Sequence, residues 1–264
     1  MNDKNEQCWF TQLLNDPNSP DFFSEFYKTY PVILYPDSLP EFAQGLNAER
    51  VLDMYAERAK NEKKFKVFNK NDPTMRDEDV QTGEEPNMRS RERLSSIFEH
   101  EHPRKAMEDL AKKETFTIRG IHRKDDSYSD FVSKCSLFWR SKTSVNCYLV
   151  HQGSDRLPVH YDAHHIFAIH THGVKRWFFW PPVIKWPRSC ETIYGVDSPN
   201  QKPLIFDVRA GEVLYIPIGW YHRTESLSDS VVHLTIGVRH SFWAVLRRAY
   251  NRRWRSKRGC PKQA

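Results

Sequence analysis

The stretch LPVHYDAHHIFAIHTHGVKRWFFWPP (residues 157–182) decides how the rest of the sequence is interpreted. It holds two short runs rich in β-branched and aromatic residues, HHIFAIH (164–170) and RWFFW (176–180). Gly173 separates the two runs, and a pair of prolines follows the second. Runs of this length and composition, bounded by glycine or proline, are typical of β-strands. The stretch therefore predicts two consecutive strands with a turn between them.

Similar runs recur between residues 115 and 238, separated by Gly, Pro, Asp and Ser. They are TFTIRGI (115–121), SVNCYLV (144–150), PLIFDV (203–208), EVLYIPI (212–218) and VVHLTIGV (231–238). Many short strands at this spacing predict an antiparallel sandwich or barrel. We therefore expect a mainly β core over residues 114–240.

The remaining segments predict helical flanks around this core. Residues 1–113 are expected to be mainly helical, with one or two strands and a polar surface loop at about 68–92. Residues 241–264 are expected to form a final helix and a basic tail. Within the first segment the predicted elements are a helical face made by Phe22, Phe23, Phe26 and Tyr27, a short strand at PVILYP (31–36), and helices over 48–64 and 104–113.

Composition narrows the class of protein and its location. The chain has 264 residues, a net charge of +6, and no run of about 18 apolar residues. Its N-terminus lacks the basic and apolar regions of a signal peptide. Five scattered cysteines without a CxxC pair argue against a disulfide framework and a cysteine zinc site. We expect a cytoplasmic protein that does not insert into membranes.

Much of the excess positive charge lies in LRRAYNRRWRSKRGCPKQA (246–264), which contains no acidic residue. Such a block can contact RNA, a ribosome surface or an anionic lipid face through phosphate groups. A solvated helix end without a specific partner fits the same composition. Both interpretations stay open.

Three residues have the pattern of a metal site. His160 and Asp162 are separated by one residue, so their side chains point to the same face of an extended strand. His222, after EVLYIPI and a turn at Gly219, is the leading candidate for a third ligand. Two histidines and one carboxylate form the facial triad of non-haem Fe(II) oxygenases. Zn or Mn also accepts these ligands, and an HxD tripeptide alone occurs often by chance.

Two further segments link this pattern to a known family. Lys175 lies fifteen residues after His160, where an ammonium can pair with the distal carboxylate of an oxo-acid. GEVLYIPIGWYH (211–222) resembles the G-(D/E)-x-L-Y-I-P-x-G-W-x-H segment of JmjC/cupin-like 2-oxoglutarate oxygenases. Within that group the chain is most similar to the ribosomal oxygenase (cupin 4) branch. The matches to this branch are FFSEFYKTYPVIL (22–34), SVNCYLV and DSVVHLTIGVRHSFW (229–243).

The resemblance implies a fold, a site and a reaction. The fold would be a double-stranded β-helix, the jelly-roll of cupin and JmjC proteins. His160, Asp162 and His222 would bind Fe(II), and Lys175 would bind the C5 carboxylate of 2-oxoglutarate, with Asn146 and Tyr148 lining the pocket. The implied reaction couples decarboxylation of 2-oxoglutarate to succinate with hydroxylation of a C–H bond.

The sequence departs from the family pattern near the same pocket. Val150 replaces a threonine, His170 stands where a glutamine often lies, and Gly237 is near a position where relatives often carry Ser or Asn. A reshaped pocket is expected.

Several other histidines lie nearby. The cluster of His164, His165, His170 and His172 is interpreted as pocket wall, support for the ligands or surface, and not as a second metal site. His233 is interpreted as a hydrogen-bonded core residue.

The leading hypothesis is a hydroxylase of an amino-acid side chain in a protein or peptide. The alternatives are a hydroxylase of a free amino acid or peptide natural product, and a non-catalytic metal-binding cupin. A demethylase is disfavoured, because no chromatin-reading domain or zinc module is visible.

Overall fold

The computed structural model describes residues 8–14, 22–61, 67–68, 105, 108–109, 111–112, 115–123, 125–153, 159–184, 187 and 201–239. Its helices are α1 (Trp9–Leu14), α2 (Ala48–Asn61) and α6 (Asp126–Trp139), with single turns at Phe22–Phe26, Glu41–Ala43 and Ile121–Arg123. Its strands are β1 (Val32–Leu34), β2 (Val67–Phe68), β3 (Thr115–Ile118), β4 (Thr143–His151), β5 (His164–His172), β6 (Val174–Trp180), β7 (Leu204–Arg209), β8 (Val213–Ile216), β9 (Tyr221–Ser226) and β10 (Ser230–Arg239).

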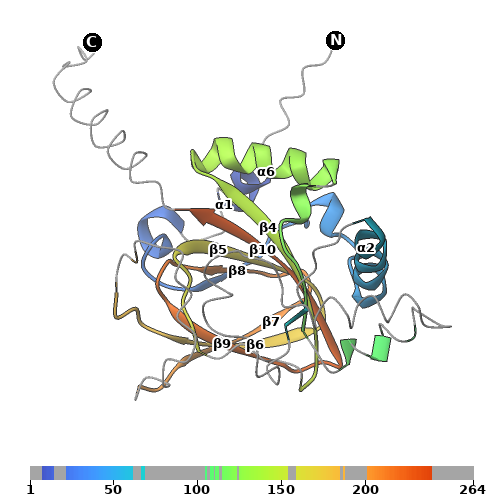
Figure 1. Ribbon diagram of the computed structural model, residues 1–264. Coiled ribbons are helices and arrows are strands. Elements are labelled where there is room, and N and C mark those ends of the chain that lie inside the picture. The colour runs from blue at the N-terminus through green and yellow to red at the C-terminus, as the bar shows by residue number, and fades with distance from the viewer. Residues whose placement is uncertain are drawn as a thin grey trace, which may run out of the picture.

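The strands form two antiparallel sheets. The larger has the order β1-β8-β5-β10-β4-β3-β2, and the smaller has the order β7-β6-β9. The two sheets lie one above the other, and the chain passes between them where β5 leads into β6 (Figure 1). This is a double-stranded β-helix, which confirms the predicted mainly β core with helical flanks.

The central strand β5 shows why its sequence is apolar almost throughout. Phe167 and Ile169 belong to the core between the larger sheet and the helices, whereas Ile166 and Ala168 belong to the core between the two sheets. Successive side chains of a strand point to opposite faces, so a strand covered on both faces has no solvent side. The sequence of β5 therefore does not alternate between apolar and polar residues.

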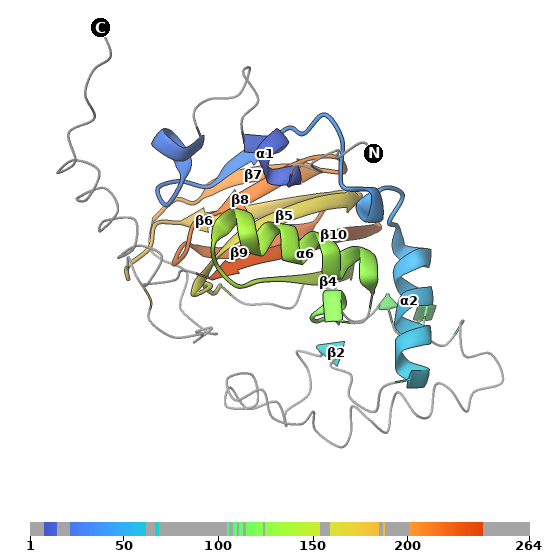
Figure 2. The same cartoon turned by 90° about the horizontal axis from the view of Figure 1, so that it is seen from above.

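Helices α1 and α6 cover the outer face of the larger sheet (Figures 1 and 2). The side chain of Asp125 caps α6 by accepting a hydrogen bond from the backbone N–H of Ser127, at 3.0 Å. The helix ends at Arg140, which has the left-handed conformation (φ 51°). Helix α6 was not predicted from the sequence, and its buried residues pack against the larger sheet in one hydrophobic core.

The N-terminal segment also contributes to the sheet. The predicted strand at 31–36 corresponds to β1, which pairs with β8, and β2 forms the opposite edge. The predicted helix over 48–64 corresponds to α2. Phe22 is buried, and Phe26 and Tyr27 pack against the same core, but Phe23 is 43% exposed, so the predicted common face was wrong for Phe23. These residues form a single π-helical turn, whose side chains are spaced differently from those of an α-helix.

Several predicted features lie outside the described residues. They are nearly all of the loop at 68–92, most of the helix at 104–113, and the C-terminal helix and basic tail at 241–264. Within the described part of the chain, no helix combines the length and apolar character needed to cross a membrane.

Candidate metal centre

His160, Asp162 and His222 are brought together by the main chain. His160 and His222 form an isolated antiparallel bridge, in which the N–H of each donates to the carbonyl oxygen of the other, at 3.1 and 2.7 Å. The N–H of Gly219 donates to the carbonyl oxygen of Asp162 at 3.0 Å. Asp162 lies in an irregular loop before β5, so the predicted regular strand through HxD was wrong. His222 follows β8 and the turn at Gly219, as predicted, and lies inside β9, which was not predicted.

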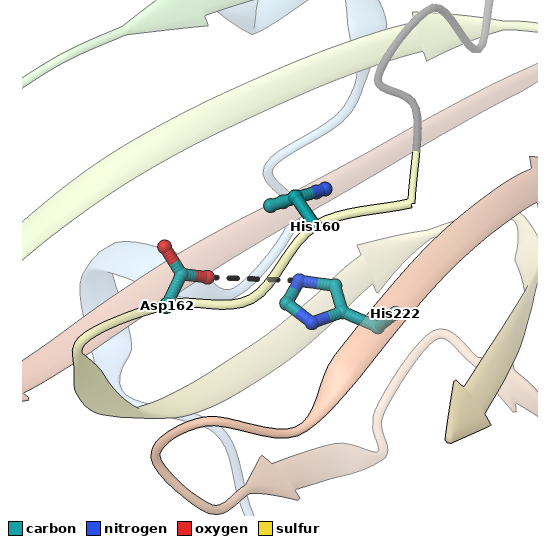
Figure 3. Close-up of side chains that lie close together, drawn as sticks. All are labelled: His160, Asp162 and His222. Carbon is teal, nitrogen blue, oxygen red and sulfur yellow. Dashed lines mark ion pairs between the residues drawn. The ribbon is translucent and has the colours of Figure 1, made fainter. Parts of the chain in front are cut away.

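The potential ligand atoms of the three side chains all lie within 4.8 Å of one another. Asp162 and His222 face each other, with Oδ2 and Nε2 3.6 Å apart, and His160 lies beside them (Figure 3). His160 and His222 are buried and Asp162 is partly buried. Divalent metals bind such ligands at about 2.0–2.2 Å, so modest side-chain rotations would bring all three to one ion.

The hydrogen bonding of His222 leaves an acceptor pointing at Asp162. The Nδ1 of His222 donates to the carbonyl oxygen of Trp220 at 3.0 Å, so the neutral ring carries its proton there. Burial lowers the pKa of His222 to about 4, which keeps the ring neutral at pH 7. Two acceptors, Nε2 and the Asp162 carboxylate, therefore face each other. A cation between them would satisfy both, so the residues present fit a divalent metal.

The charge state of Asp162 suits the same role. Burial raises the pKa of this carboxyl, but the nearby basic side chains together lower it by more, His164 first and then His222, His160 and Arg119, so the net shift is downward. Asp162 is therefore ionised at neutral pH, as a metal ligand must be.

Lys175 lies on the interior face of β6, further along the sheet. Its side chain is only 4% exposed, and its ammonium lies 5.8 Å from the centroid of the Trp177 ring. In the pairing of β6 with β9, His222 lies opposite Phe179, and Lys175 lies opposite Ser226. The ammonium and the ligand cluster thus belong to the same inner face, four residues apart along the strand.

Asn146 and Tyr148 share the interior face of β4. The ring of Tyr148 stacks on His233 with centroids 4.9 Å apart, and its hydroxyl is within hydrogen-bonding reach of Thr235 and Asn146. The Oδ1 of Asn146 accepts the backbone N–H of Gly120 at 2.9 Å. Burial raises the pKa of Tyr148, so its hydroxyl stays protonated. These groups form a polar row on the larger sheet that faces Lys175 and Trp177 on the smaller one.

The structure separates the four clustered histidines. His170 is buried on the interior face and stacks on His233, with centroids 5.2 Å apart. His165 faces the other way, and its Nδ1 contacts the Tyr215 hydroxyl at 2.9 Å. His172 is exposed at the end of β5, and His164 lies against Gly237. The described residues yield one cluster of metal-ligating side chains, and these four are not part of it.

One residue near the site was not singled out from the sequence. Arg119, exposed in the turn after β3, lies close enough to influence the charge of both Tyr148 and Asp162. A single arginine in a polar turn gives no signal in the sequence, because such residues are common on surfaces.

Comparison with known proteins agrees with this geometry. Residues 120–246 match the JmjC domain family. Ribosomal oxygenase 2 of Rattus norvegicus is 30% identical over 129 residues, covering 47% of this chain and 27% of that protein. JmjC domain-containing protein 8 of Homo sapiens is 38% identical over 71 residues, covering 23% of this chain and 26% of that protein. The matched segments thus span about a quarter of these relatives.

Solved structures of the Escherichia coli ribosomal oxygenase YcfD have the same fold. One aligns over 94% of this chain and 58% of YcfD, with a TM-score of 0.54 and 14% identity. Another, in complex with cobalt and 2-oxoglutarate, aligns with a TM-score of 0.53 and 16% identity. At this identity the likeness shows the fold alone, whereas the sequence matches show the relationship. The chain carries a JmjC domain and is a distant relative of the ribosomal oxygenases.

Proposed function

We propose that this protein is an Fe(II)- and 2-oxoglutarate-dependent oxygenase that hydroxylates an amino-acid side chain in a protein or peptide. The observation that carries the proposal is the pair of acceptors on His222 and Asp162, fixed 3.6 Å apart beside His160. Two imidazoles and one carboxylate suit Fe(II) and leave room for further ligands. When bound, the iron would supply the chemistry that couples oxygen activation to decarboxylation of the oxo-acid.

The chain's own residues would bind and orient the two organic molecules. Lys175 would hold the C5 carboxylate of 2-oxoglutarate, since its ammonium is buried on the inner face that also carries the ligand cluster and can form a charge-assisted hydrogen bond there. Asn146 and Tyr148, on the opposite sheet, would line the same pocket. The apolar side chains of Trp177 and Phe179 lie between Lys175 and His222 on the inner face of the smaller sheet and would exclude water there.

A protein or peptide substrate is supported by the relatives. Besides the ribosomal oxygenases, the matches include a bifunctional lysine-specific demethylase and histidyl-hydroxylase of Drosophila persimilis, 29% identical over 104 residues. Arg119 is exposed beside the candidate site, where it would meet an incoming substrate. The basic segment 246–264 would add contacts to RNA or a ribosome surface.

The proposal is tested by reconstituting the protein anaerobically with Fe(II), then adding 2-oxoglutarate and O₂ and measuring succinate. We expect slow succinate formation that is lost in His160→Ala and retained in His172→Ala, an exposed histidine of the same region. Binding of 2-oxoglutarate to the Co(II)-loaded protein, followed by calorimetry, provides a second readout that needs no substrate. A protein that binds neither metal nor 2-oxoglutarate would exclude the proposed function.

A further inference from the structure

His170 is a fully buried histidine whose tautomer is fixed by its neighbour. It is 0% exposed on the interior face of β5, and its Nε2 accepts the indole N–H of Trp177 at 3.2 Å. An indole nitrogen only donates, so Nε2 must present its lone pair. Burial, aided by the charge of Lys175, lowers the pKa of His170 to about 3. The neutral ring therefore carries its proton on Nδ1.

This Nδ1–H has no hydrogen-bond partner among the described residues, and it has no access to solvent. The Nδ1 of His233, on the ring stacked against His170, is buried and without a partner in the same way. Leaving a buried donor without an acceptor destabilises the folded protein. Buried polar atoms are rarely left so in folded proteins, and an unmet donor in the interior points to a ligand that supplies the acceptor.

The charge around His170 identifies the chemistry of that ligand. The indole N–H of Trp177 contacts His170 at 3.2 Å, and the Lys175 ammonium lies 5.8 Å from the centroid of the same Trp177 ring, so Lys175 and His170 flank one aromatic side chain. The charge of Lys175 accordingly helps to lower the pKa of both His170 and His233. An ammonium and an N–H group offer donors only. A carboxylate offers acceptors only and carries the charge opposite to that of the ammonium, so it can accept the Nδ1–H of His170 and be attracted to Lys175 at the same time.

We propose that His170 donates its Nδ1–H to the distal carboxylate of the oxo-acid co-substrate, beside Lys175, and so determines selectivity for a dicarboxylic acid. Trp177 acts as a positioning residue, because its indole N–H holds the His170 tautomer in which Nδ1 is the donor. This inference rests on the proposed function and adds a donor to the groups expected from Lys175, Asn146 and Tyr148.

The test compares two acids of equal chain length, 2-oxoglutarate and 2-oxopentanoate, which lacks the distal carboxylate. Binding of each to Co(II)-loaded protein is measured by calorimetry. The variants are His170→Leu, which removes the donor, His170→Gln, which can keep both a donor and an acceptor, and Trp177→Phe, which releases the tautomer. His172→Leu, at the exposed end of the same strand, is the matched control. Circular dichroism checks that each variant is folded.

We expect wild type to prefer 2-oxoglutarate by at least about 100-fold. His170→Leu should weaken 2-oxoglutarate binding by about tenfold. Its affinity for 2-oxopentanoate should stay within about twofold of that of wild type. His170→Gln should recover most of the loss, and Trp177→Phe should lose part of the preference. If His170 had only a structural role, His170→Leu would weaken the binding of both acids equally, and that result overturns the inference. Unchanged 2-oxoglutarate binding in His170→Leu overturns it as well.

The two proposals fail differently. If wild type binds Co(II) and 2-oxoglutarate but the His170 variants do not change the preference, only the role of His170 is wrong. If wild type binds Co(II) but neither acid, the proposed function is wrong and the inference falls with it. Should His170→Leu not fold, the conservative Trp177→Phe and His170→Gln variants still decide the question by the ratio of the two affinities.

Discussion

The backbones of His160 and His222 are paired, with the N–H of each donating to the carbonyl oxygen of the other. This pair ties the loop before β5, in the larger sheet, to β9, in the smaller sheet. Two of the three candidate ligands are therefore positioned by main-chain hydrogen bonds that do not depend on their side chains or on a metal. Such a site is organised before the ion binds.

Because that pairing uses only backbone atoms, His222→Ala should remove a ligand without unfolding the protein. We expect its affinity for Co(II) to fall by about 100-fold or more, while the circular dichroism spectrum stays that of wild type. Calorimetric titration with Co(II) measures the affinity, and His172→Ala provides the control. Wild-type affinity in His222→Ala would remove this residue from the ligand set.

Lys175→Met keeps the length of the side chain's apolar part and removes the charge. If Lys175 holds the distal carboxylate, 2-oxoglutarate binding should weaken by about 10- to 100-fold, since a charge-assisted hydrogen bond in a buried site is worth about 1.5–3 kcal/mol. Co(II) affinity should not change, because Lys175 lies four residues along β6 from the partner of His222. A parallel loss of metal binding would instead indicate damage to the smaller sheet.

Gly173 makes the turn between β5 and β6, and thereby between the two sheets. Its φ is +75°, and a Cβ there would overlap the carbonyl oxygen of Ser230. We expect Gly173→Ala to lower the free energy of unfolding by more than the roughly 1–2 kcal/mol of left-handed strain alone. Gly211→Ala isolates that strain, because Gly211 has φ +94° and no described atom within 4 Å of an added Cβ. Equal losses in urea unfolding would show that the close approach at Gly173 is unimportant.

The sequence predicted the strands well where apolar runs are continuous, as in β5 and β6. It did not predict β9, because YHRTES (221–226) has little apolar character and its pairing with β6 is a tertiary effect. Helix α6 was missed because DSYSDFVSKCSLFW mixes polar and apolar residues, and its burial against the larger sheet decides its structure.

The candidate site shows the same division between pattern and tertiary structure. The spacing of His160, Asp162 and Lys175 suggested the chemistry together with the resemblance of residues 211–222 to the oxygenase family, and the structure brings His160 and Asp162 close to His222. The sequence did not indicate how the side-chain rings of the site are oriented. The bond from Trp177 to His170, and the stacking of His170 on His233, depend on strand register between elements far apart in the chain.

The buried histidines predict how stability depends on pH. Burial lowers the pKa of His170 to about 3 and that of His222 to about 4, and it lowers the pKa of His233 well below 6.5. Between about pH 6.5 and 4 the unfolded chain therefore binds protons that the folded chain does not, and stability falls as the pH falls. Each such histidine contributes at most about 1.4 kcal/mol per pH unit.

Urea unfolding of the metal-free protein at pH 7.0, 6.0 and 5.0 measures this slope. His233→Gln should reduce it by up to about 1.4 kcal/mol per pH unit, because one buried neutral imidazole is gone. A slope in His233→Gln equal to that of wild type would mean that His233 takes up a proton without unfolding.

Gly237 lies on β10 and makes room for the side chain of His164. A Cβ at Gly237 would lie 2.7 Å from Cδ2 and 2.8 Å from Nε2 of His164, closer than side chains approach. Its φ is not positive, so an alanine meets no backbone strain there, and the cost of Gly237→Ala should come mainly from the ring, with a smaller contribution from Ser144 Oγ at 3.2 Å. We expect a loss of about 1–3 kcal/mol in the free energy of unfolding.

A double-mutant cycle separates this contact from other effects. His164→Ala removes the ring that the new methyl group would strike, so Gly237→Ala should cost much less in that background, with a coupling of about 1–2 kcal/mol measured by urea unfolding. If the losses in unfolding free energy of the two single variants simply add in the double variant, His164 is free to turn away from Gly237. Coupling would instead mean that the glycine holds His164 over the interior face, next to Asp162, where its imidazole shares the surroundings of the metal ligands.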